Sequence, residues 1–182
     1  MNPGIEIAEA VAEDAPGFAH SQLHAWRRAY AGVMDPSYLA SMGLERMTRR
    51  WSEMLGEPVP GVHHLALRAG GETVGWSRCG NPRDDVEDGT GELHAINLLP
   101  DFWSQGLGSR LFRASVEGLR QMGHVRAYLW VAKGNDRGSL STRRFFNQRE
   151  LRTPGLQARS PKTVPQSVGS ADGVAANQGR QS

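Results

Sequence analysis

The stretch LLPDFWSQGLGSRLF, residues 98–112, places two glycines, Gly106 and Gly108, between an apolar run and an amphipathic helical pattern. The first N–H groups of a helix have no partner within the helix, and the helix dipole concentrates positive charge there. Because both glycines lack Cβ atoms, a ligand can approach this backbone closely. The stretch therefore predicts either a tight turn from strand to helix or a cradle for an anionic phosphate group.

Polar side chains next to the glycines favour the cradle. Ser109 offers a hydroxyl group and Arg110 a full positive charge, both of which suit a pyrophosphate. The stretch lacks the Gly-Lys-Ser/Thr ending of a nucleoside triphosphate loop. It also lacks the third glycine of the dinucleotide fingerprint. These two nucleotide-binding classes are therefore disfavoured.

Strand and helix patterns alternate on both sides of this turn. The predicted strands cover residues 5–11, 62–69, 72–78, 91–100 and 125–132. The predicted helices cover residues 15–30, starting at Asp14, then a segment from Asp35–Pro36 to Gly56, and a segment from the glycine turn to Gly123, with a short helix after the last strand. This order predicts a mixed α/β sheet with helices on its faces.

Charge and composition divide the chain into a domain at residues 1–147 and a basic tail at 148–182. Residues 1–136 carry 13 Lys and Arg against 17 Asp and Glu, whereas residues 137–182 carry 8 against 2. The tail has no aromatic residue and few aliphatic ones, so it buries too little apolar surface to offset its ordering entropy, and we expect disorder. A basic tail can bind nucleic acid without sequence specificity, which is one hypothesis for function.

The remaining composition indicates a cytoplasmic protein without a membrane span. The single cysteine, Cys79, excludes an internal disulfide. The N-terminus shows no secretory signal, and no apolar run approaches the roughly 18 residues that span a bilayer. Asp84, Asp85, Glu87 and Asp88 with His63 and His64 fit no metal-ligand spacing, so a solvated acidic loop and no metal are predicted.

Residues 91–137 resemble the central motif of the GNAT superfamily, the acetyl-CoA-dependent N-acetyltransferases. The family pattern is a strand ending near a proline, then Q/R-x-x-G-x-G/A opening a helix, then a strand ending in Asn. Here this glycine motif falls on residues 103–108, with Trp103 in place of Gln or Arg. Upstream, AWRRAYAGVMDPSYLASM (25–42) and RMTRRWSEML (46–55) look like the two acceptor-side helices of small bacterial members.

The resemblance implies an acyl-CoA N-acyltransferase fold and an enzyme that transfers acetyl from acetyl-CoA to an amine of a small molecule or peptide by direct attack. The strand at 92–98 would splay from its neighbour, so that the backbone of Leu98 binds the pantetheine arm. The amides of residues 105–110 would hold the pyrophosphate. The implied cofactor-binding residues are Leu98, Leu99, Gln105, Gly106, Leu107, Gly108, Ser109, Arg110 and Asn135.

Amine acetylation requires removal of a proton from the nucleophile, either directly or through water. Glu92, at the start of the strand that would carry the thioester, is the first candidate for the base, and His94 is the second. The two-residue period of a strand predicts one shared face for Glu92, His94, Ile96 and Leu98.

The C-terminal part departs from the family pattern. Phe145–Phe146 stands where the family shows Phe-Tyr, whose hydroxyl lies by the CoA sulfur, and the last two strands of the family are not recognisable. Without them, the strand at 125–132 would expose an edge. The alternative hypothesis is therefore a catalytically impaired, acyl-CoA-binding GNAT-like protein. A homodimer is left open.

Overall fold

The structure, a computed structural model, describes residues 4–32, 35–131 and 142–147. Its strands are β1 (Ile5–Glu9), β2 (Val62–Ala69), β3 (Glu72–Gly80), β4 (Thr90–Leu98), β5 (Arg126–Val131) and β6 (Thr142–Asn147). Its helices are α1 (Ala15–Ala29), α2 (Pro36–Ser41), α3 (Leu44–Gly56) and α4 (Leu107–Gln121), with short 3-10 turns η1 (Ala12–Asp14) and η2 (Pro100–Phe102).

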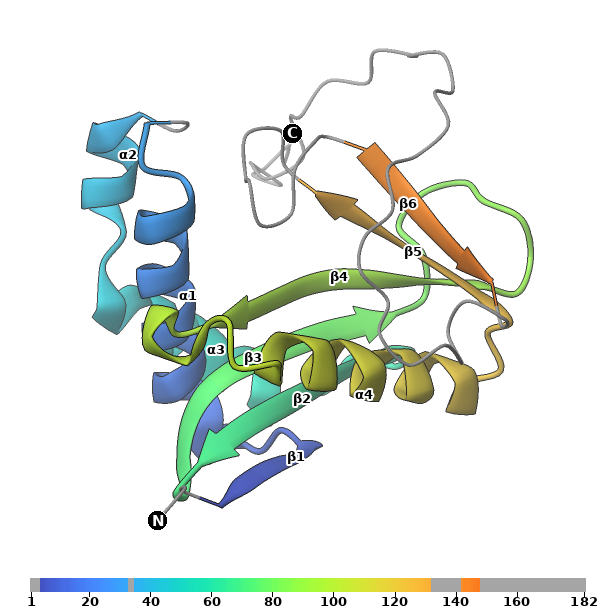
Figure 1. The fold of residues 1–182 in the computed structure, drawn as a ribbon, viewed down its shortest axis with the longest axis horizontal. Coiled ribbons are helices and arrows are strands. Elements are labelled where there is room, and N and C mark those ends of the chain that lie inside the picture. The colour runs from blue at the N-terminus through green and yellow to red at the C-terminus, as the bar shows by residue number, and fades with distance from the viewer. Residues whose placement is uncertain (1–3, 33–34, 132–141, 148–182) are drawn as a thin grey trace, which may run out of the picture.

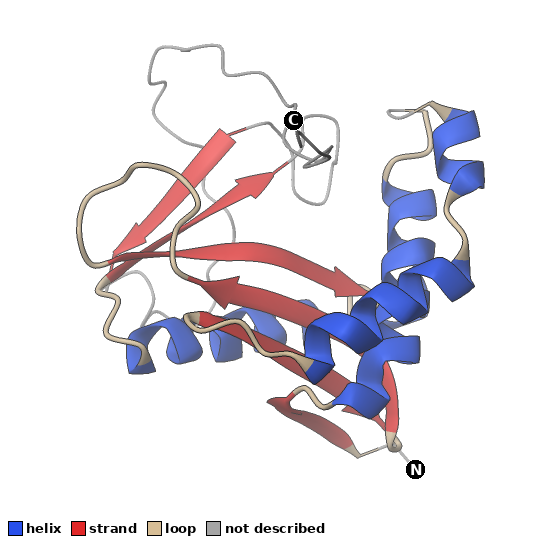
Figure 2. Ribbon diagram, turned by 180° about the vertical axis from the view of Figure 1, so that it is seen from behind, coloured by secondary structure: helices blue, strands red, loops and turns tan. Residues whose placement is uncertain are grey.

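The described strands form one sheet in the order β1-β2-β3-β4-β5-β6. All neighbours are antiparallel except β4 and β5, which run parallel and are connected through α4. Helices α1 and α3 cover one face of the sheet and α4 covers the other (Figures 1 and 2). This arrangement confirms the predicted mixed α/β class.

Two features of the C-terminal half differ from the sequence prediction. Residues 142–147 form strand β6 rather than part of a short helix, and β6 pairs along the whole of β5. The predicted exposed edge on β5 is therefore wrong, because β6 supplies its hydrogen-bonding partner. The predicted basic tail at 148–182, and with it any further strand, lies outside the described residues.

The helical segment predicted from Pro36 to Gly56 is divided in two. The carboxylate of Asp35 caps α2 by accepting hydrogen bonds from the N–H groups of Ser37 and Tyr38. The chain then becomes extended at Met42 and Gly43 before α3 begins. The extended backbone at both residues interrupts the helical hydrogen bonding, so the start signal at Asp35–Pro36 and the end at Gly56 belong to two different helices.

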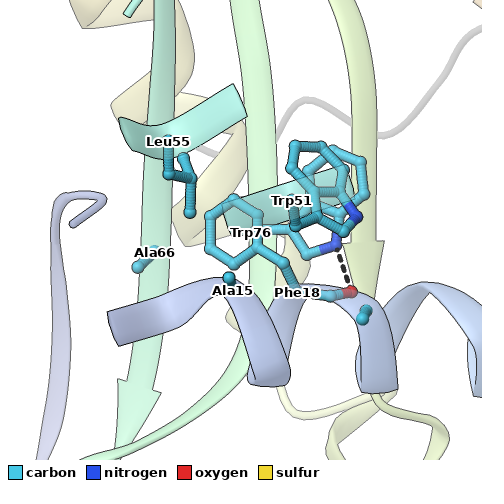
Figure 3. Packing of buried hydrophobic residues seen from close by; sticks show 7 residues of the cluster. Ala15, Phe18, Trp51, Leu55, Ala66 and Trp76 are labelled. Atoms are coloured by element: carbon cyan, nitrogen blue, oxygen red, sulfur yellow. Dashed lines mark hydrogen bonds between the residues drawn. The ribbon is translucent and has the colours of Figure 1, made fainter. Parts of the chain in front are cut away.

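An aromatic cluster fixes α1 and α3 on β2 and β3 (Figure 3). Phe18 of α1 stacks on Trp76 of β3 with ring centroids 5.3 Å apart, and Trp51 of α3 meets both rings edge-on. The indole of Trp76 donates a hydrogen bond of 3.0 Å to the carbonyl of Phe18. Burial of these large rings and satisfaction of the buried indole N–H together hold both helices against the sheet.

Asp14 precedes α1 as predicted, but its side chain does not cap that helix. It is buried and accepts hydrogen bonds from Arg68 of β2, at 3.0 Å from Nε to Oδ1, and from the hydroxyl of Thr73 on β3. Burial alone would raise the pKa of Asp14, but these hydrogen bonds and the Arg68 charge lower it overall. Asp14 thus joins the start of α1 to two strands.

We expect D14N to lower the free energy of unfolding by about 2 kcal/mol at pH 7, because it removes the buried carboxylate partner of Arg68 and leaves only the exposed Glu6 paired with it. The lowered pKa of Asp14 gives a stabilising contribution that is present above the pKa of the unfolded chain and is lost as the pH falls through the folded value. Urea unfolding of both proteins between pH 7 and pH 3 measures this. A gap that stays constant with pH would contradict the assignment.

Candidate active site

The parallel strands β4 and β5 form a fork. They pair only over Thr90–Leu93 of β4 and Arg126–Leu129 of β5, although β4 continues to Leu98. In Figure 1 the two strands start close together and diverge toward α1 and α2. Past the fork, the backbone groups of β4 that face away from β3 have no β5 partner. Such an open strand edge can bind an extended ligand as an added strand.

A β-bulge lies where the fork opens. Arg78 of β3 pairs with Ala95, whereas the next residue, Cys79, pairs with Leu93. His94 is therefore an extra residue on β4, with no partner on β3. A bulge bends its strand and locally increases the twist, which places this distortion at the first residue beyond the last β4–β5 pair.

The bulge changes which side chains share a face. A common face was predicted for Glu92, His94, Ile96 and Leu98. That prediction is wrong. Leu98 packs with Leu111 of α4, on the same face as Leu93. Glu92 is next to Leu93 in the strand, so its side chain points to the opposite face. One extra residue reverses the alternation of all that follow. The catalytic candidates therefore face α1 and α3, and the far end of β4 packs on α4.

The glycine turn has the geometry of an open cradle at the start of α4. Gly106 is the N-cap residue and has a φ of 76°, a left-handed conformation that favours glycine. A Cβ atom built on Gly106 or on Gly108 would meet no other atom within 4 Å. No side chain therefore extends from either glycine over this turn. The first helical hydrogen bond runs from the N–H of Arg110 to the carbonyl of Gly106, so the N–H groups of residues 107–109 have no intrahelical acceptor. A pyrophosphate fits this cradle.

Side chains of the preceding loop hold this cradle in position. The indole of Trp103 donates a hydrogen bond of 2.7 Å to the carbonyl of Leu98, and the amide of Gln105 donates one of 2.8 Å to the carbonyl of Asp101. The N–H of Leu99 bonds to Val74 of β3. Since backbone groups alternate along a strand, the N–H of Leu98 faces away from β3, toward the fork.

The structure thus brings most of the predicted cofactor residues to one end of β4. Leu107 is buried beneath the turn, and Ser109 and Arg110 are exposed in the first turn of α4. Asn135 lies outside the described residues.

Glu92 lies on β4 but is not solvated, because its side chain is completely buried. It accepts hydrogen bonds from the backbone N–H of Arg83 at 2.9 Å, from the Arg83 guanidinium, and from the hydroxyl of Tyr128 at 3.0 Å. Burial would raise the pKa of Glu92, but the bonds and charge from Arg83 lower it overall. Its oxygens are thus already engaged and weakly basic.

His94, unlike Glu92, has a proton-accepting atom that no described residue engages. Its side chain is 4% exposed, and its Nε2 lies 2.9 Å from the carbonyl of Asn81, which can only accept a hydrogen bond. Nε2 therefore carries the proton, and the buried Nδ1 keeps its lone pair with no hydrogen-bonding partner among the described residues. Burial lowers the pKa of His94, so the ring is neutral at pH 7. Glu92 lies 3.7 Å from Nε2.

Three residues next to these two candidates were not identified from the sequence. Arg83 and Tyr128 bind Glu92, and Arg78 lies across from the bulge on β3. The parallel pairing of Glu92 with Tyr128 depends on the register of two strands separated by a helix. No local sequence signal encodes that register, so only the fold could identify these residues.

The acidic loop shows side-chain pairing. Glu87 forms an ion pair with Arg126, and Asp84 accepts a hydrogen bond of 2.8 Å from the indole of Trp130. Within residues 4–32, 35–131 and 142–147, no group of three or more His, Cys, Asp or Glu side chains could hold a metal ion. In the same part of the chain, no helix combines the length and the apolarity needed to cross a bilayer.

A sheet that forks between two parallel strands, beside a helix opened by a glycine cradle, is the fold of the acyl-CoA N-acyltransferases. Residues 22–146 match the family described as the acetyltransferase (GNAT) family. The chain belongs to this family and is an acetyltransferase. The predicted family, fold and enzyme class are confirmed.

Relatives and solved structures agree with this assignment. The chain is 29% identical to the uncharacterised N-acetyltransferase YuaI of Bacillus subtilis strain 168, over 72% of this chain and 73% of the relative. It is 26% identical to an N-acetyltransferase of Archaeoglobus fulgidus, over 82% and 95%. The crystal structure of PaiA N-acetyltransferase from Thermoplasma acidophilum in complex with coenzyme A superimposes with a TM-score of 0.59 and 18% identity, over 73% and 82% of the two chains. The last likeness concerns the fold.

Proposed function

We propose that this acetyltransferase takes its acetyl group from acetyl-CoA and transfers it, in the cytoplasm, to the amine of a small molecule or peptide by direct attack. The observation that carries the proposal is the neutral His94 ring, whose Nδ1 lone pair has no described partner at the point where β4 leaves β5. His94 is the general base and Glu92 its positioning and electrostatic partner, which reverses their order as candidates from the sequence.

Acetyl-CoA, when bound, supplies the thioester that the amine attacks. The N–H groups of Gly106, Leu107, Gly108 and Ser109 bind its pyrophosphate, with Arg110 and the Ser109 hydroxyl beside them. The N–H of Leu98, facing the fork, binds the pantetheine arm, and Leu99 and Gln105 keep this end of the loop in place. An open αL glycine followed by orphan helix N–H groups supports this assignment.

Proton transfer determines which amines react. A free alkylamine has a pKa near 10, so it is protonated at neutral pH and must lose a proton before it attacks. His94 accepts this proton at Nδ1, and the Glu92 carboxylate stabilises the resulting imidazolium. The N–C bond then forms as the C–S bond breaks. The products are the N-acetylated acceptor, CoA as its thiol and one released proton, so no covalent enzyme intermediate is needed.

The test combines binding with turnover. We expect acetyl-CoA to bind in calorimetry, and a panel of primary amines to give acetyl-CoA-dependent release of thiol together with an N-acetylated product by mass spectrometry. Binding without product on any amine would instead support the catalytically impaired, acyl-CoA-binding alternative. Absence of both binding and turnover in a folded sample would contradict both proposals.

We also expect E92Q to lower kcat about tenfold to 100-fold, because the amide cannot stabilise an imidazolium as a carboxylate does. Acetyl-CoA affinity should remain within about twofold, since Glu92 faces away from α4. Steady-state kinetics and calorimetry on the same preparation measure the two quantities. Equal loss of affinity and turnover would indicate a structural role for Glu92 instead.

A further inference from the structure

A half-buried cation, Arg78, lies close to both catalytic candidates. It lies on β3, between Ser77 and Cys79, which both contact Ser115 of α4, so its own side chain points to the α1 and α3 face. Its Nε–H is buried and has no hydrogen-bonding partner in the described part of the chain. Within the same residues, no carboxylate forms an ion pair with its guanidinium. An unsatisfied buried donor on a charged group is costly, and such cost is frequently retained for ligand binding.

The charges around Arg78 increase this cost. Burial and the charges of Arg83 and Arg50 lower the pKa of Arg78, and only Glu92 acts in the other direction. Glu92 is engaged by Arg83 and Tyr128. The face between β3 and α3 therefore carries positive charge that the described residues do not neutralise.

Two histidines flank Arg78 on the same face. His64 pairs directly with Arg78 from β2, is 8% exposed, and has a buried Nε2 without a described partner. Burial, with the charges of Arg78 and His94 beside it, lowers the pKa of His64 to about 4, so its ring is neutral at pH 7. A neutral ring protonated at Nε2 is a hydrogen-bond donor. On the other side, His94 presents the Nδ1 lone pair.

Adjacent strands thus present opposite hydrogen-bonding capacities. Arg78 offers donors to an anion, as does His64 in the tautomer protonated at Nε2, and His94 offers an acceptor to an ammonium group. Arg78 pairs with Ala95, the residue next to His94, and the charge of Arg78 acts on the His94 ring, where it lowers the pKa. Two groups this near each other can bind the ammonium group and the carboxylate of one small molecule. A planar carboxylate also matches the fork of donors on a guanidinium.

Resting on the proposed function, we propose that the acceptor is a free amino acid or an amine bearing a nearby carboxylate. The carboxylate binds Arg78, with His64 as second donor, while the amine faces His94. Acetylation of this acceptor by acetyl-CoA gives the N-acetyl amino acid, CoA as its thiol and one released proton. Arg78 is then a specificity-determining residue, since it selects the acceptor and takes no part in the proton transfer.

The test compares the amino acids with their C-terminal amides as acceptors, using wild-type protein and R78M. Wild type should acetylate at least one amino acid with a kcat/KM at least about tenfold above that of its amide. R78M should remove this preference, because KM rises more for the acid than for the amide and the ratio of the two kcat/KM values falls to near one. R78K should retain part of the preference. R78M should not melt below wild type, because it removes an unpaired buried charge.

Binding of the reaction product tests the role of Arg78 without requiring that the protein acetylate any amine. N-acetyl amino acids and their amides are titrated by calorimetry into protein saturated with CoA, before and after R78M. Selective binding of the acids that R78M removes would support the inference even if no amine were acetylated, in which case only the proposed function fails. Acetylation of amides as efficiently as acids, or failure of every N-acetyl amino acid to bind, would overturn the inference. If other amines are acetylated in that case, the proposed function stands.

Discussion

H94Q is expected to lower kcat about 1,000-fold, within the range that a positioned general base contributes. The substitution is matched to the structure, because the glutamine amide can still donate to the carbonyl of Asn81, as Nε2 of His94 does. What it removes is the lone pair at Nδ1. Acetyl-CoA affinity should stay within about twofold of wild type, since the cradle lies at the start of α4. Single-turnover kinetics with saturating acetyl-CoA measures the chemical step.

The pH dependence of the same pair of proteins tests the role of His94 more directly. Burial lowers the pKa of His94 below its ordinary value of 6.5, so the ring is neutral and able to accept a proton above that value. As the pH falls through the lowered pKa, wild-type kcat should fall while H94Q should not follow. Dividing the wild-type kcat by the H94Q kcat at each pH removes the effect of the titration of the amine acceptor, which is common to both proteins. A ratio that does not change between pH 7.5 and pH 5, with E92Q carrying the larger loss, would assign the base to Glu92.

G108L is expected to weaken acetyl-CoA binding at least about 100-fold, or about 3 kcal/mol, by filling the cradle at the start of α4. A Cβ atom at Gly108 meets nothing within 4 Å, so the new side chain occupies the space of the ligand without clashing with the protein. Gly108 is within α4, where leucine is a better helix former than glycine. The melting temperature should therefore be equal to or above that of wild type.

G118A is the matched control in the same helix. A Cβ atom there makes only ordinary contact with the Cys79 sulfur at 3.9 Å, far along α4 from the cradle. It gains the same kind of helix propensity and should bind acetyl-CoA within about twofold of wild type. Calorimetric titration of the three proteins measures the affinities. Wild-type affinity in folded G108L would mean that the coenzyme binds elsewhere.

The cradle was the part of the site that the sequence predicted most directly. Its chemistry depends on residues adjacent in the chain: a left-handed glycine at 106, a second residue without a side chain at 108, and a helix that begins between them. Local conformational preferences determine such a turn, so a short motif was sufficient. The same holds for the hairpin of β2 and β3 around Gly70 and Gly71, both of which have positive φ.

The other half of the site depends on contacts between distant segments. The extra residue at His94 places the side chains of Glu92 and Leu98 on opposite faces of the sheet. No periodic pattern in the strand reveals this extra residue. The sequence placed Glu92 at the start of a strand as the first candidate base. It did not reveal that Arg83 from the acidic loop and Tyr128 from β5 hydrogen-bond to its buried carboxylate.

The sequence by itself therefore determined the family, most of the order of strands and helices, and the glycine turn that opens α4, because these follow from local conformational preference and from the spacing of apolar residues. Only the tertiary structure decided which of Glu92 and His94 has a lone pair without a described partner, and that Arg78 forms no ion pair with the described residues around them. Strand register, burial and charge pairing produce those properties, and each is set by residues far apart in the chain.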